Sequence, residues 1–109
     1  MSEVAKIDTL RSLGESSISS SYAAVGSVIT HPIRILCITN NTDGDMIFSD
    51  DGVNDKLFVA KSSFKLFDIA TNKDDRGESF ALTSQTQMYV KYSTSPSTGS
   101  VYVEVIYGL

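Results

Sequence analysis

The chain has 109 residues, a formal net charge of −4 and a hydrophobic content of 41%. This length accommodates a single core, and the apolar content suffices to build it without a metal or a cofactor. Because the balance is acidic and the nine Lys and Arg residues are scattered, we expect no nucleic-acid partner.

No run in the sequence approaches the roughly 18 apolar residues that a membrane-spanning helix requires. The first residues lack the basic start and the continuous apolar stretch of a secretory signal. We therefore expect a protein that is made in a cytoplasm and has no membrane contact.

Residues 1–21 form an N-terminal arm that differs in composition from the rest, because they contain no aromatic residue and many serines. Val4, Ile7, Leu10 and Leu13 recur every third residue, which predicts one short helix or 3-10 turn. An isolated helix of this length is marginal in water and needs a surface to lie on. That surface is either a partner protein, which would make these four residues an interface, or the chain's own domain.

From Tyr22 onward, short apolar or alternating runs separated by turn residues are typical of an all-β domain, which we assign to residues 22–109. About eight strands are expected, and two packed antiparallel sheets or a jelly roll would accommodate them. The expected strands are 22–29, 33–39 (central, with Pro32 at its start), 46–49, 57–59, 63–69, 80–82, 87–92 and 100–107. A solvated loop is expected over residues 71–78.

The last two strands flank residues 95–99, whose length and composition suit a hairpin connection. In the final strand Val101, Val103 and Val105 share one face, so we expect them in the core.

Catalytic motifs are missing from the sequence, which has no Gly-rich phosphate loop and no metalloprotease signature. The single histidine, His31, directly precedes Pro32 at a strand entrance, where a role as general base is improbable. The acidic stretches 43–45 and 50–55 allow either an ion site or plain turn formation, and turn chemistry is the favoured reading. We expect no enzyme activity and no metal.

Cys37 lies in an apolar run, where a buried thiol behaves as a small hydrophobic side chain. As the single cysteine it cannot form an intrachain disulfide.

Four tyrosines, at positions 89, 92, 102 and 107, cluster in the last two strands. Three interpretations are open for these tyrosines. They are ordinary strand residues, or they belong to a protein interface, or they form a platform on which sugars or bases stack. We select Tyr89 and Tyr102 as interface candidates.

Most of residues 22–109 resembles small virion proteins of tailed bacteriophages. In those proteins a strand ends on an Asn-x-Thr-Asp turn, a Ser-x-Asp-Gly loop follows, and an alternating apolar strand closes the domain. The matching stretches here are 24–29, 35–43 with Asn40-Asn41-Thr42-Asp43, 47–52 with Ser49-Asp50-Asp51-Gly52, 68–73, and 101–108. The N-terminal arm is not covered.

The resemblance implies a non-enzymatic structural component of a phage virion, in the first place a capsid cement or decoration protein that stabilises the shell. Its partners would be the major capsid protein or portal and tail proteins, with further copies of itself as a homo-oligomer. A head-tail junction or tail accessory protein is the alternative, and a carbohydrate- or receptor-binding module is the alternative from another class. We expect that a chain without residues 1–21 still folds but enters particles less well.

Overall fold

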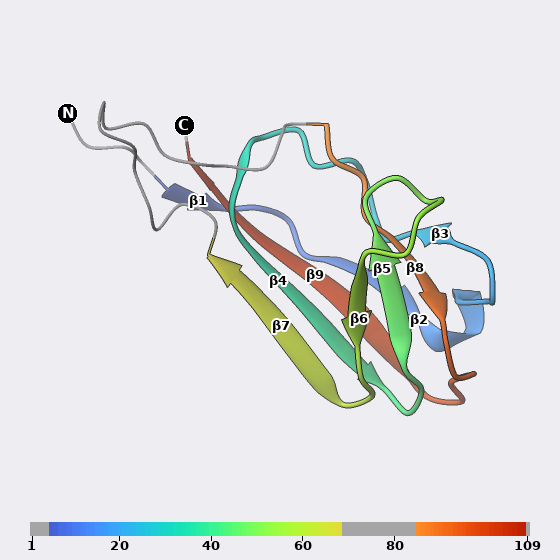
Figure 1. The fold of residues 1–109 in the computed structure, drawn as a ribbon. Helices are drawn as coiled ribbons and strands as arrows, with labels where there is room; N and C mark the ends of the chain where they lie inside the picture. Colours follow the sequence, from blue (N-terminus) through green and yellow to red (C-terminus); the bar gives the residue numbers. More distant parts are fainter. Residues whose placement is uncertain (1–4, 69–84, 109) are drawn as a thin grey trace.

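The computed structural model describes residues 5–68 and 85–108, which form two packed antiparallel sheets (Figure 1). The five-stranded sheet contains β1 (Ala5–Ile7), β2 (Arg11–Gly14), β4 (Ile33–Thr42), β7 (Ser63–Asp68) and β9 (Gly99–Gly108). The four-stranded sheet contains β3 (Ala23–Ala24), β5 (Met46–Ser49), β6 (Leu57–Val59) and β8 (Tyr89–Tyr92). The expected antiparallel β-sandwich is confirmed.

The core lies between the two sheets and is built from alternate residues of their long strands. Val101, Val103 and Val105 of β9 are at most 1% exposed, as the alternation predicts. Facing residues on the other sheet include Phe48 and Val90, which are fully buried. The remaining buried apolar residues are Ile18, Val25, Ile29, Ile33, Leu36, Ile38, Met46, Val59 and Met88.

β4 and β9 are the two central strands of the five-stranded sheet, in the order β1-β9-β4-β7, with β2 also paired to β9. The expected central position of the strand after Pro32 is therefore confirmed. β4 contains a bulge between Ile33 and Ile35, after which its register with β9 is regular to Thr42.

The expected hairpin between the last two strands is wrong. β8 pairs with β3 and β5, whereas β9 pairs with β1, β2 and β4, so the connection crosses from one sheet to the other. The β4–β5 turn crosses in the same way, and the two crossings are joined to each other. Asp43 accepts a hydrogen bond from the hydroxyl of Ser97 and two from the backbone N–H groups of Ser97 (2.7 Å) and Thr98 (3.2 Å).

In the N-terminal arm, residues 5–7 and 11–14 are strands, and the short helix or 3-10 turn expected from the spacing of Ile7, Leu10 and Leu13 is not formed there. β1 and β2 pair with β9, and a single 3-10 turn, Glu15–Ser17, follows β2. Strand pairing satisfies the backbone of this segment, which a marginal short helix could do only at the cost of nucleation. The boundary at residue 21 stays a prediction, but Ile18 belongs to the core.

The other expected strands are found with small differences. β5 and β6 have the expected bounds, and β7 is described from Ser63 to Asp68, so the last residue expected in this strand, residue 69, lies outside the described residues. The strand expected over 22–29 is reduced to β3 and one isolated bridge between Ile29 and Thr86. The strand expected at 80–82 and the loop expected at 71–78 lie outside the described residues.

Candidate assembly surface

The outer side of the five-stranded sheet, turned away from the core, is rich in apolar side chains. Strand register places the outward residues in three rows across β9, β4 and β7. The rows are Ile106–Ile35–Asp68, Glu104–Cys37–Leu66 and Tyr102–Thr39–Phe64, and Ile7 of β1 extends the first row beyond Ile106. We call these ten residues the apolar face.

Three large side chains of the apolar face are strongly exposed. Ile7 is 82% exposed, Phe64 65% and Leu66 60%. Single exposed apolar residues are common, but a cluster on one sheet face marks an interaction site. The apolar face is therefore the strongest candidate for a binding surface among the described residues.

The two sides of β7 have different surroundings. Phe64 and Leu66 lie together on the outer side, and the core receives the other side of the strand through Phe67. Cys37 is not fully buried as expected. It is half-buried on the apolar face, because its neighbours Leu36 and Ile38 take the inward positions.

Charged side chains lie on and beside the apolar face. Glu104 and Asp68 occupy outward register positions. Arg34 lies in the bulge of β4 next to Ile35, and Arg34 and Asp68 each take part in an interaction within the chain.

The interface residues predicted in the N-terminal arm separate in the structure. Ile7 belongs to the apolar face, and Leu10, 57% exposed, lies between β1 and β2. Leu13 points inward and packs against the core, so it supports the fold. Val4 lies outside the described residues. Contact of Ile7 and Leu10 with a partner stays a prediction.

Arg11 fixes the segment that carries Ile7 and Leu10. Its side chain is 6% exposed. Nε donates to the carbonyl oxygen of Ser27 (2.7 Å), Nη2 to that of Val28 (3.1 Å), and Nη1 to the carboxylate of Asp8 (3.2 Å) and the carbonyl oxygen of Thr9 (3.0 Å). The role of this residue was not predicted from the sequence, where a lone arginine gives no signal of burial.

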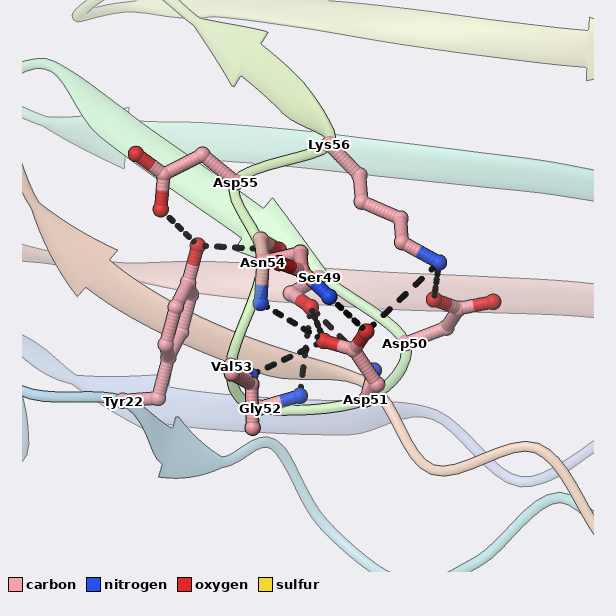
Figure 2. A network of polar contacts seen from close by, with 9 residues as sticks. All are labelled: Tyr22, Ser49, Asp50, Asp51, Gly52, Val53, Asn54, Asp55 and Lys56. Atoms are coloured by element: carbon pink, nitrogen blue, oxygen red, sulfur yellow. Dashed lines mark hydrogen bonds and ion pairs between the residues drawn. The ribbon is translucent and has the colours of Figure 1, made fainter.

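On the opposite outer face, that of the four-stranded sheet, residues 49–56 form a loop held together by polar contacts (Figure 2). Ser49 is fully buried, and its hydroxyl oxygen accepts hydrogen bonds from the backbone N–H groups of Asp51 and Gly52, both 3.1 Å. Gly52 has φ +72°, and a β-carbon there would meet the ring of Tyr89 at 3.3 Å. Tyr89 thus lies beneath this loop.

Asp51 organises the same loop. Its carboxylate accepts hydrogen bonds from the hydroxyl of Ser49 (2.6 Å) and from the backbone N–H groups of Val53 and Asn54, both 2.9 Å. These donors, the Ser49 hydroxyl first, hold the pKa of Asp51 well below its usual range. The favoured turn reading of this stretch has a structural basis, because its carboxylate binds the loop's own donors.

Tyr22, Asp55 and Lys91 tie the loop to the sheet. The hydroxyl of Tyr22 donates to Asp55 (2.6 Å), and the Lys91 ammonium lies 2.9 Å from Asp55 and 4.8 Å from the Tyr22 ring centroid. Desolvation and then the bond to Asp55 raise the pKa of Tyr22, and the hydrogen bonds from Tyr22 and Lys91 lower that of Asp55. Lys56 pairs with Asp50 at 2.7 Å.

The two tyrosines predicted as interface residues lie on opposite sides of the sandwich. Tyr102 belongs to the apolar face, whereas Tyr89 lies under the loop of the other sheet. A single planar interface cannot contact both.

The structure also describes the surroundings of the residues that were considered for catalysis and metal binding. The ring of His31 stacks on Tyr107 with centroids 3.9 Å apart, which assigns this histidine a packing contact. Within residues 5–68 and 85–108, no three side chains of His, Cys, Asp and Glu come together in a way that could hold a metal ion. Over the same residues, no helix is long and apolar enough to span a membrane.

Comparisons with known proteins link the fold to a virus particle. No protein-family model matches the chain, and no curated protein matches it either. A chain from a solved structure of a cyanophage Pam1 capsid asymmetric unit matches with a TM-score of 0.59 and 19% sequence identity. The match covers 98% of this chain and 86% of the capsid chain. At this identity it establishes a shared fold.

Proposed function

We propose that the chain is a non-enzymatic component of a tailed-phage capsid, namely a cement or decoration protein that binds to the shell and stabilises it. The observation that carries the proposal is the structural match to a capsid chain over almost the whole length of this protein. Because the match also covers most of the capsid chain, that chain is itself a small domain of similar size.

The geometry supports attachment to a larger assembly. A small domain whose outward sheet face exposes Ile7, Phe64 and Leu66 gains free energy when that face is covered. The turn motifs shared with small virion proteins also have defined roles here. Asn40 and Thr42 are buried and bonded to each other (2.6 Å), and Ser49 and Asp51 build the loop on the other sheet.

A binding pocket for a small ligand receives little support. The cavity between Leu36, Leu57, Phe67 and Met88 has a volume of about 260 Å³, which is below the usual range for small-molecule sites. Two alternatives, a receptor-binding module and a head-tail or tail accessory protein, are separated from a cement protein by the experiment below.

The test is the copy number of the chain in purified particles of the phage that encodes it, measured by quantitative mass spectrometry against the major shell protein. We expect a copy number close to that of the shell protein, that is, a ratio near one. A ratio that corresponds to one ring would assign the chain to the head-tail junction or tail, and absence from particles would overturn the proposal.

A matched test uses shells assembled without the chain. We expect such shells to form but to release their genome at a lower temperature, and purified chain added back should restore the release temperature. Unchanged release temperatures would contradict a stabilising role even if the chain is present.

A further inference from the structure

We infer that the apolar face binds a largely apolar shell-protein surface that places a Lys or Arg side chain against Glu104, and that it does not bind a second copy of this chain. The inference rests on the proposed function and adds the partner chemistry and the residues that recognise it. It commits to one of the two outer faces.

The first argument is the contrast in satisfied groups. On the four-stranded sheet, loop 49–56 lies over Tyr89, and its carboxylates are bonded to the loop's own donors and to Lys91 and Lys56. On the five-stranded sheet, Phe64 and Leu66 lie side by side on β7 and are 65% and 60% exposed, whereas Phe58 on the other sheet is 48% exposed. Covering this pair together with Ile7 yields more hydrophobic free energy than covering the other face.

The second argument is shape. Because β1, β9, β4 and β7 are hydrogen-bonded neighbours, the three outward rows form a continuous surface across the sheet (Figure 1). Aromatic residues at two positions of one row, Tyr102 and Phe64, are the side-chain types enriched in interface centres.

The third argument is charge, and it selects the occupant. Glu104 lies in the middle of the face, opposite Cys37. A second copy docked face to face would bring the Glu104 carboxylates of both copies into a desolvated interface, which is unfavourable. A partner that places a cation against Glu104 would instead form an ion pair there. Self-association, if present, must use another surface.

The experiment compares two exposed phenylalanines on opposite sheets. Phe64 on β7 belongs to the apolar face, and Phe58 on β6, 48% exposed, belongs to the other sheet. Phe64→Thr and Phe58→Thr make the same chemical change, and threonine, a β-branched residue, retains a good strand propensity at both positions. Wild type and one variant are produced together at equal levels during infection, and their ratio in purified particles is measured by mass spectrometry.

We expect particles to contain at least about tenfold more wild type than Phe64→Thr, as for an interface residue of central importance. The ratio for Phe58→Thr should stay within about twofold of one. Circular dichroism and thermal unfolding of the purified variants serve as the control that both are folded. Equal incorporation of Phe64→Thr, or selective loss of Phe58→Thr, overturns the inference and leaves the proposed function intact.

The charge argument is tested with Glu104→Lys and Glu104→Gln in the same competition. We expect Glu104→Lys to be excluded at least about tenfold and Glu104→Gln less, because only the former repels a cationic partner. Incorporation of Glu104→Lys at the wild-type level would contradict a basic partner surface.

Two further outcomes are decisive. Cys37 lies on the apolar face, so N-ethylmaleimide should alkylate it more slowly in intact particles than in the free chain, and equal rates would contradict docking of this face. Sedimentation of the free chain tests whether a second copy binds the apolar face. A dimer that Phe64→Thr abolishes would show that this face binds another copy of the chain, and would contradict the inference. Absence of wild type from particles would instead refute the proposed function itself.

Discussion

The two outer faces of the sandwich differ in how their side chains are surrounded. Each sheet has one side that is turned away from the shared core. On the four-stranded sheet, residues 49–56 fold back over Tyr89, and the hydroxyl of Ser49 and the carboxylate of Asp51 satisfy the loop from within. On the five-stranded sheet, Ile7, Phe64 and Leu66 are exposed.

This difference teaches where a partner is needed. A loop whose polar groups are already bonded gains little from a new neighbour, since each new bond replaces an existing one. Exposed apolar side chains gain from any well-fitting cover. Changes to one face should therefore alter stability, whereas changes to the other should alter attachment.

The largest expected effect comes from Arg11, which connects the fold to the apolar face. Arg11→Ala leaves the carbonyl groups of Ser27 and Val28 without their donors and should lower the free energy of unfolding by about 2–4 kcal/mol. Particle incorporation should fall as well, because Asp8 and Thr9 beside Ile7 lose their partner.

Urea unfolding measures the first effect and competition in particles the second. Arg11→Lys is the matched control, since it keeps the charge but lacks the guanidinium fork whose three nitrogens reach Ser27, Val28 and Asp8 at once, so it should be intermediate. Unchanged stability of Arg11→Ala would contradict the role assigned to this residue.

A smaller effect is expected at Ser49, on the covered face. Ser49→Ala removes the acceptor for two backbone N–H groups in a fully buried position, and we expect a loss of about 1–2 kcal/mol. Incorporation of the folded variant should equal that of wild type. Selective exclusion from particles would show that the loop, and not the apolar face, contacts the shell.

The smallest effect is expected at the corner where the β4–β5 turn meets the β8–β9 connection. Hydrogen bonds from Ser97, its hydroxyl first, lower the pKa of Asp43 from 3.8 to about 2 in the folded chain. A carboxyl with a depressed folded-state pKa stabilises the fold above pH 3.8, and this contribution is lost as the pH falls from about 4 to about 2.

Thermal unfolding between pH 5 and pH 2 tests this expectation. The midpoint should fall across that window, and the fall should be shallower in Ser97→Ala because the hydroxyl donor is gone. The same slope in both chains would show that other carboxyls dominate. Neither outer face is touched by this change, so it separates fold stability from attachment.

Local patterns predicted the elements of the fold well. The alternation in the last strand placed Val101, Val103 and Val105 in the core, and the bounds of β5 and β6 follow from their flanking turn residues. The fold class followed because short alternating runs can bury their apolar side only against another sheet.

Pairing partners were not predictable in the same way. Nothing in the alternation of β8 and β9 indicates that they belong to different sheets, since periodicity carries no information on the neighbouring strand. The apolar spacing around Ile7 and Leu13 favoured a helix, but strand pairing with β9 satisfies the same residues better. Whether Phe64 points inward or outward depends on which sheet β7 joins, and this is set by pairing with β4, a strand distant in the sequence.

The position of β9 has a consequence for how the chain folds. β9 is the shared neighbour of β1, β2 and β4, and it follows all other described strands in the sequence. During synthesis on the ribosome, those three strands must wait for their common partner, so the five-stranded sheet closes late and by contacts of long sequence separation. The nascent chain therefore carries an unpaired edge on β4, and lacks the Val101, Val103 and Val105 side chains of the core, until β9 emerges.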